Sequence, residues 1–192
     1  MSQALRPSQK TRARPRRREA RGWLFVAVIV ALAAAGVVWW AAAARPLGPP
    51  PPWMGQQVPD EGRDHVPVGS SIEYRAHPPA SGPHYPAPAP TGVYAQGLLT
   101  GFWVHSLEHG YIVLAYKPPL PDSLLAEFNR MVTDFPRSKF GNVKLVIVPY
   151  DQMLHPFAVL AWDWRLEMDA FDRDTVLKFY RAHVDRGPED IP

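Results

Sequence analysis

The sequence predicts an α+β domain, with a mixed sheet and two helices packed on one face of it, preceded by a single transmembrane helix. Three observations predict this fold class. Residues 23–44 form a long apolar run without a charge. The runs 111–116 and 143–148 are continuous apolar segments with the length of buried strands. Residues 123–135 repeat apolar side chains at helical spacing, and a similar stretch follows Asp172.

These observations divide the 192 residues into four parts. We predict a basic cytoplasmic tail over 1–22, a transmembrane helix over 23–44, a proline-rich linker over 45–59 and an extracytoplasmic α+β domain over 60–192. The tail holds eight basic residues against Glu19 alone and carries +7, which leaves −4 for the rest because the whole chain is +3. An acidic body behind a basic tail argues against a nucleic-acid-binding domain.

The apolar run has the length and the flanks of a membrane anchor. A helix of this length reaches roughly 33 Å, enough for a hydrocarbon layer about 30 Å thick. Trp23 lies at one end and Trp39 with Trp40 near the other, where interfacial tryptophans are common. The arginines before Trp23 place the N-terminus in the cytoplasm and everything after Arg45 outside, since positive charge stays inside.

Other interpretations of the N-terminal region stay open. Ala42-Ala43-Ala44 fits the small-residue pattern of a signal-peptide cleavage site. Arg16-Arg17-Arg18 allows twin-arginine export. In the linker, the run Pro49–Pro52 favours polyproline II and a semi-rigid spacer, and a motif for an aromatic groove on a partner is the alternative.

The elements of the domain follow from periodicity and from helix signals. Alternation over 66–74 predicts a strand, and the proline-rich segment 78–92 predicts an irregular loop. Asp122 is expected to cap the helix over 123–135, and Asp172 a last helix that ends before Gly187-Pro188. The further predicted strands are 98–104, 111–116, 143–148 and 157–164.

The order of these elements places both helices most economically on one face of the sheet. The region 110–186 covers most of a split β-α-β, ferredoxin-like unit, and the early strands are expected to fill its missing edge. A thioredoxin-like arrangement without a redox cysteine pair is the alternative.

Histidine is the main candidate for chemistry in this domain. The chain has no cysteine, which excludes disulfides, thiolate metal sites, iron–sulfur clusters and cysteine nucleophiles. His105 and His109 lie four residues apart and share a face in a helix. The Pro/Gly-stiffened loop that holds His84 can bring it to this pair, and three imidazoles suit zinc or copper. We therefore predict a copper or zinc site at His84, His105 and His109, with His65 and Glu108 as further candidate ligands.

Competing interpretations apply to each of these residues. Glu108 also fits a hydrogen-bond partner that fixes an imidazole tautomer. The pattern His105-x-x-Glu108-His109 matches that of inverted zinc peptidases, in which the glutamate activates water. Gly110 stops the long helix that such a peptidase needs. His183 is expected to pack on a helix face, the pair Met153 and His155 to belong to a loop, and any single histidine to be structural.

The segments PPASGPHY (78–85), GVY (92–94) and HSLEHGYIVLAY (105–116) resemble a bacterial family catalogued as domain of unknown function 3105. Pro188-Glu189 and Leu160-Ala161-Trp162 also resemble its landmarks, so the resemblance covers about 60–190. It implies a single N-terminal membrane span before the domain and no assigned activity. His84, His105 and His109, with Glu108 beside them, match its motifs, while Ala80 and Asp163 depart from the common Thr and Gly.

The sequence favours a membrane-anchored extracytoplasmic protein that handles or senses a transition metal, with no catalytic residue predicted. The expected partners are the membrane and an unidentified envelope protein. Nucleic acid is not expected, and nucleotide-binding and serine-hydrolase motifs are absent from the sequence. One alternative is a non-catalytic envelope interaction module, which an exposed patch of Trp162 and Trp164 would favour. Another is a metal-dependent hydrolase with Glu108 as base.

Overall fold

The computed structural model describes residues 17–43 and 51–192. The chain divides into two units, Met1–Gly48 and Pro49–Pro192, and each is described by itself. In the first unit, α1 spans Arg17–Ala43 and takes up nearly all of the predicted transmembrane segment. Within the described residues, no helix meets the length and apolarity needed to cross a bilayer. Most of the predicted tail and the start of the predicted linker lie outside the described residues.

The second unit begins within the predicted linker. A short 3-10 helix, η1, spans Pro52–Met54, and β1 spans Gln56–Gln57. The ring of His183 donates a hydrogen bond from Nε2 to the carbonyl of Met54 at 3.0 Å. The strand β1 pairs in antiparallel fashion with Trp164 and Arg165. Folded structure therefore starts a few residues before the predicted boundary at residue 60.

A mixed six-stranded sheet forms the centre of this unit, in the order β1-β6-β5-β3-β4-β2. The remaining strands are β2 (Gly92–Val93), β3 (Ile112–Tyr116), β4 (Leu145–Pro149), β5 (Phe157–Ala161) and β6 (Trp164–Met168). β4 runs parallel to both β2 and β3, whereas β3, β5 and β6 form antiparallel pairs. Two short segments that were not predicted as strands, β1 and β2, form the two edges of the sheet, whereas the early strands expected there, 66–74 and 98–104, are absent.

The connections differ from a split ferredoxin-like unit. β3 and β4 are direct parallel neighbours joined through α3 (Asp122–Asp134), with no strand inserted between them. An antiparallel hairpin, β5–β6, and α4 (Arg173–His183) then follow. A parallel β-α-β unit joined to a hairpin and a helix is closer to the thioredoxin-like alternative.

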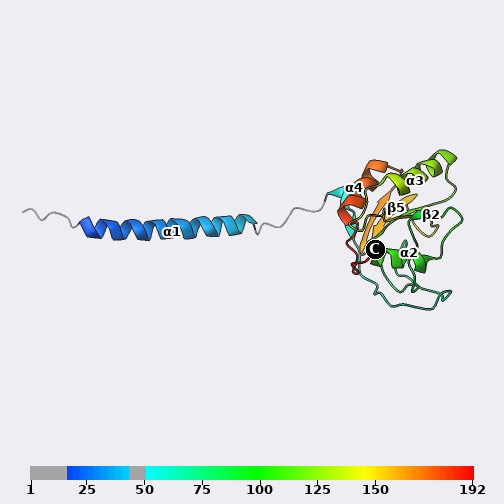
Figure 1. Cartoon of the computed structure of the whole chain (residues 1–192), viewed down its shortest axis with the longest axis horizontal. Coiled ribbons are helices and arrows are strands. Elements are labelled where there is room, and N and C mark those ends of the chain that lie inside the picture. The colour runs from blue at the N-terminus through cyan, green and yellow to red at the C-terminus, as the bar shows by residue number, and fades with distance from the viewer. Residues whose placement is uncertain (1–16, 44–50) are drawn as a thin grey trace, which may run out of the picture. The chain divides into compact units, whose positions relative to one another are not determined.

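The two faces of the sheet carry separate hydrophobic clusters. On the first, the helix-covered face, Phe128 and Met131 of α3 and Phe179 of α4 pack on side chains of β3, β4 and β5. On the second, the loop-covered face, Trp103 and Leu107 of α2 (Thr100–Glu108) pack on the opposite side chains of the same strands. Figure 1 shows α3 and α4 on one side of the sheet and α2 on the other. Two helices on one face, as predicted, are confirmed.

The helix predicted over 123–135 is confirmed within one residue at each end, and the last helix starts after Asp172 as predicted and ends at His183, before Gly187. The side chain of Asp172 accepts a hydrogen bond from the backbone N–H of Asp174 and caps α4, as expected. The prediction that Asp122 caps α3 is wrong: Pro121 holds the cap position without a side-chain hydrogen bond, and Asp122 is already helical. A carboxylate in the first turn still interacts favourably with the helix dipole.

Three strand predictions are wrong, each for a physical reason. Residues 66–74 form no strand, because Pro67 lacks an N–H and Gly69 adopts a φ of +87°. Residues 98–104 enter α2, whose side chains are buried almost all round, so no amphipathic period marks the helix. Residues 157–164 belong to two strands, because Asp163, at a φ of +60°, turns the chain between them.

Candidate metal centre

The short helix α2 places the central residues of the site. His105 and Glu108 lie in its last turn, and His109 follows as its C-cap. Gly110 then adopts a φ of +74°, in the left-handed region that commonly ends a helix. A Cβ at Gly101 would lie 2.7 Å from the ring of Tyr85. The absence of a side chain at Gly101 therefore lets the loop before β2 lie directly on α2.

Backbone hydrogen bonds hold two loop histidines beside this helix. Tyr85 donates its N–H to the carbonyl of Gly101 at 3.1 Å. His84 donates its N–H to the carbonyl of Asp64 at 3.0 Å, and its own carbonyl accepts from Val66 at 2.8 Å. These two bonds form an isolated parallel bridge between His65 and His84. The bridge carries His65, distant from α2 in the sequence, into the same cluster.

Four side chains converge at this point: His65, His84, His105 and Glu108. Each offers one ligand atom, and these atoms all lie within 4.8 Å of one another. Oε2 of Glu108 lies 3.0 Å from Nε2 of His84 and 3.9 Å from Nε2 of His65. The three imidazole rings have centroids 4.8–5.0 Å apart. We call this group the His3Glu cluster.

The cluster is buried on all sides except one. The side chain of His65 is 49% exposed, whereas those of His84 and Glu108 are 0% and 3% exposed. His105 is also buried. Solvent therefore reaches the His3Glu cluster beside His65.

The orientation of two imidazoles is fixed by carbonyl groups. Nδ1 of His84 lies 2.8 Å from the carbonyl oxygen of Gly82, and Nδ1 of His105 lies 2.5 Å from that of Tyr85. A carbonyl oxygen only accepts, so both Nδ1 atoms carry a proton and donate. Each neutral ring then presents the lone pair of its Nε2, as in metal sites where the other ring nitrogen donates to a carbonyl or carboxylate.

Burial keeps the histidines of α2 in their neutral form. Desolvation lowers the pKa of His105, although the hydrogen bond to the Tyr85 carbonyl opposes this effect. Desolvation, followed by the neighbouring His105, lowers the pKa of His109 to about 4. At neutral pH both rings are therefore unprotonated at one nitrogen, which is the form that coordinates a metal.

His109 lies beside the cluster, on the far side of His105. Its Nε2 lies 2.9 Å from Nε2 of His105 and 3.4 Å from Oε2 of Glu189. Because Nε2 of His105 carries a lone pair, His109 donates to it from Nε2. Nδ1 of His109 is buried and has no hydrogen-bond partner among the described residues. The predicted trio of His84, His105 and His109 is thus close together, but His109 is not one of the four converging residues.

Residues 185–191 lie over the C-terminal end of α2 and are hydrogen-bonded to it. We call this segment the clasp. Glu189 donates its N–H to the carbonyl of Glu108 at 3.0 Å, and Asp185 donates to that of Gly110 at 3.0 Å. A Cβ at Gly187 would lie 2.1 Å from the Glu108 carbonyl oxygen, so only glycine allows this approach. The fully buried Lys144 donates from Nζ to the carbonyls of His109 and Ile191, which ties the clasp to β4.

Other residues singled out in the sequence are not among the four converging residues. His183 is buried in the helix-covered face, as expected for packing, with its ring 4.4 Å from that of Phe179. His155 lies in the loop before β5 and pairs with Asp169 at 2.7 Å. Trp162 and Trp164 are half-buried on opposite faces of the sheet, so they form no shared exposed patch.

His65 was only a further candidate ligand from the sequence, and the carbonyls that anchor the imidazoles could not be found from it. Carbonyl acceptors belong to the backbone and leave no residue pattern. The available signal was Gly82, whose φ of +121° is accessible mainly to glycine. Its position two residues before His84 indicates a loop bent to direct its own carbonyl at the imidazole.

One known protein family matches the part of the chain that holds the cluster. The family described as "Protein of unknown function (DUF3105)" matches residues 65–191. No curated protein and no solved structure gives a significant match to the chain. The matched region covers more than half of the chain and contains the entire His3Glu cluster, His109 and the clasp, so the protein belongs to this family of unknown function.

Proposed function

We propose that the domain binds one copper or zinc ion through His65, His84, His105 and Glu108. The observation that carries this proposal is the direction of the lone pairs. Nδ1 of His84 and Nδ1 of His105 both donate to carbonyls, so Nε2 of His84 meets the carboxylate of Glu108 as an acceptor at 3.0 Å, and Nε2 of His105 carries a lone pair to which His109 donates. Acceptors gathered in a buried space repel one another unless a cation or a proton lies between them.

A proton is the alternative to a metal ion at this point. A protonated His84 would donate from both nitrogens, to Gly82 and to Glu108, and would satisfy that pair alone. It would give His65 no part in the cluster, and His105 would stay bonded to His109 alone. A metal ion uses all four groups at once, and for this reason we favour it.

The donor set limits the choice of metal. Three imidazole nitrogens and one carboxylate oxygen suit Zn²⁺ and Cu²⁺, whereas Cu⁺ prefers the sulfur ligands that this group lacks. Cu²⁺ binds nitrogen and oxygen sites more tightly than Zn²⁺ in general. The cluster therefore supports copper or zinc, and affinity alone favours copper.

This ligand set contains His65 in place of the predicted His109. Coordination by Nε2 of His109 would force its proton onto Nδ1, which is buried without an acceptor among the described residues. Such a buried unpaired donor costs about 1–3 kcal/mol. His109 is better suited to donate a hydrogen bond to Nε2 of His105 while no ion is bound.

We further propose that this domain stands outside the cell on an N-terminal membrane anchor. The support is in the sequence: an uncharged run over 23–44, tryptophans near both ends and a tail of +7 before it. Metal handling or sensing fits better than hydrolysis, because Glu108 lies within the ligand group itself and leaves no second carboxylate in it to act as a base. An interaction module lacks a specific observation, since the two tryptophans form no patch.

Metal analysis of the full chain, purified in mild detergent, tests the binding proposal. After equilibration with Cu²⁺ or Zn²⁺ and removal of loose ions, we expect about one ion per chain by mass spectrometry of the metal. His65→Ala removes the exposed ligand with little risk to folding and should lower the bound metal. His155→Ala, at another exposed histidine, is the matched control and should bind as the parent does. Equal metal content in the His65→Ala and parent proteins would contradict the proposal.

Membrane fractionation with reporter fusions tests the location. A reporter that is active only outside the cytoplasm should be active when fused after residue 192, and alkaline carbonate should leave the chain in the membrane fraction. Replacing the arginines before Trp23 with glutamines should lower reporter activity, because the orientation signal is lost. Release by carbonate would instead indicate a chain without an anchor.

A further inference from the structure

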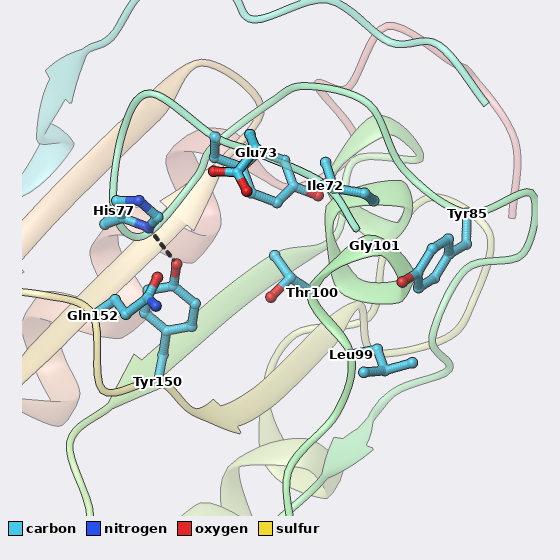
Figure 2. Close-up of a pocket in the computed structure, with 10 residues that line it drawn as sticks. Ile72, Glu73, His77, Tyr85, Leu99, Thr100, Gly101, Tyr150 and Gln152 are labelled. Atoms are coloured by element: carbon cyan, nitrogen blue, oxygen red, sulfur yellow. Dashed lines mark hydrogen bonds between the residues drawn. The ribbon is translucent and has the colours of Figure 1, made fainter. Parts of the chain in front are cut away.

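A second site lies at the opposite end of α2 from the His3Glu cluster. A cavity of about 440 Å³ opens where α2 begins, between the segment 72–77 and the end of β4. Figure 2 shows its lining side chains, with Glu73, His77, Tyr150 and Gln152 toward one side and Leu99 and Tyr85 toward the other. We call this space the Tyr150 cavity. Its volume is in the range of small-molecule sites.

The polar side of the cavity is negative and holds oriented acceptors. Burial raises the pKa of Tyr150 to about 12, so its hydroxyl keeps its proton, and its oxygen is hydrogen-bonded to Nδ1 of His77 at 2.6 Å. In either direction of this bond, the hydroxyl oxygen keeps a lone pair for a further donor. Glu73 adds a carboxylate, and Gln152 an amide oxygen. Among the described residues that line the cavity there is no lysine or arginine.

The other side of the cavity is apolar. Leu99 is 55% exposed, an unusual position for a large aliphatic side chain directly before a helix. Tyr85 presents its ring beside it, with the hydroxyl already donating to the carbonyl of Ser70 at 3.0 Å. A ligand that fills the cavity therefore meets a negative polar wall at one end and apolar surface at the other.

We propose that the Tyr150 cavity binds a small organic amine, with its ammonium group toward Glu73 and Tyr150 and its apolar body against Leu99 and Tyr85. An ammonium group donates three hydrogen bonds and matches the acceptors of the polar wall. An aromatic ring near a cation adds a further attraction. This proposal does not depend on the metal site.

The cavity also contains hydrogen-bond donors that favour an anion over a cation. The first N–H groups of α2 and the remaining N–H of His77 are donors, and they would attract a carboxylate. The full charge of Glu73 in the same cavity works against such an anion. The charge of the ligand that binds more tightly therefore decides between an amine site and a carboxylate site.

A charge series on one molecular body tests the proposal. Phenethylamine, phenethyl alcohol and phenylacetate share a ring and a two-carbon reach or nearly so, and differ in head-group charge. With the full chain in mild detergent, we expect calorimetry to show phenethylamine binding about tenfold more tightly than either of the others, the size expected for one hydrogen bond to a charged group. Equal affinity for the alcohol, tighter binding of phenylacetate, or no saturable binding of the amine would each overturn the proposal.

Variants locate the binding and separate it from the metal site. Glu73→Gln should lower the affinity for phenethylamine about tenfold and leave that for the alcohol unchanged. Asp122→Asn, which removes an exposed carboxylate on the other face of the sheet, is the matched control and should have no effect. His65→Ala should leave amine binding intact. An unchanged amine affinity in Glu73→Gln would overturn the assignment of this cavity, whatever the metal content of the protein.

Discussion

The two faces of the sheet are built in different ways, although they share the same strands. The helix-covered face packs two amphipathic helices, α3 and α4, on alternate side chains of β3, β4 and β5. The loop-covered face packs one short helix and a long irregular loop, joined by backbone hydrogen bonds and close glycine contacts. Both the His3Glu cluster and the Tyr150 cavity lie on the loop-covered face. Regular packing supplies stability on one face, and the irregular chain on the other positions polar groups.

Removing a large side chain from the helix-covered face should have the largest effect. Phe128→Ala deletes a fully buried ring from α3, and we expect the free energy of unfolding to fall by about 3–5 kcal/mol. Chemical denaturation measures this loss. Leu154→Ala, at a site 87% exposed, should stay within about 0.5 kcal/mol of the parent. Similar losses in both variants would mean that the packing of this face has been misjudged.

Adding one methyl group on the loop-covered face should affect both stability and metal binding. Gly101→Ala forces a Cβ against the ring of Tyr85, and we expect a loss of about 1–3 kcal/mol in unfolding free energy. Since the Tyr85 carbonyl holds His105, metal affinity should fall as well. Denaturation and metal titration measure the two effects. Gly92→Ala, where a Cβ would meet its nearest neighbour at 3.4 Å, is the control. If Gly101→Ala bound metal as tightly as the parent, the packing of the loop on α2 would not control metal binding.

Removing the charge of the carboxylate in the cluster should weaken metal binding with little change in shape. Glu108→Gln keeps the size of the side chain but loses its charge, so we expect metal affinity to fall about tenfold or more. Competition titration against a chelator of known affinity measures the change. Glu189→Gln removes a carboxylate that faces His109 outside the four converging residues and should change affinity much less. A larger loss of affinity in Glu189→Gln than in Glu108→Gln would indicate that the ion binds beside His109.

Acid should lower the unfolding free energy of the protein slightly, because His183 is buried in the helix-covered face. Desolvation lowers the pKa of this buried histidine, so below about pH 6.5 the unfolded chain takes up a proton that the folded chain resists. The contribution is therefore complete above pH 6.5 and falls as the pH drops below this value toward the lowered pKa of the folded state. Melting temperatures of the metal-free parent and His183→Gln across this range measure it. The difference between the two proteins should narrow in acid, and a constant difference would argue against this role.

The comparison of the two faces also explains how far the sequence could be interpreted. Phe128 and Met131 in α3, and Val176 and Phe179 in α4, are spaced as on one face of a helix, and the runs of β3 and β4 are continuously apolar, so one face was predictable from periodicity. α2 is buried almost all round and shows no such period, so it was mistaken for a strand. In the site, His105 and Glu108 were marked by their spacing. The position of His65 depends on a single backbone bridge to His84, which no local pattern encodes.

The clasp of residues 185–191 over the end of α2 has a consequence for the order of events during synthesis. The four residues of the His3Glu cluster all leave the ribosome well before Gly187 and Glu189 do. Until these residues arrive, the carbonyl of Glu108 lacks the N–H of Glu189, and Lys144 lacks the carbonyl of Ile191. In a nascent chain, the side chains of the His3Glu cluster therefore lie on a helix end that still lacks these hydrogen bonds. Arrival of residues 185–191 is the step that gives this end of α2 its final hydrogen bonds.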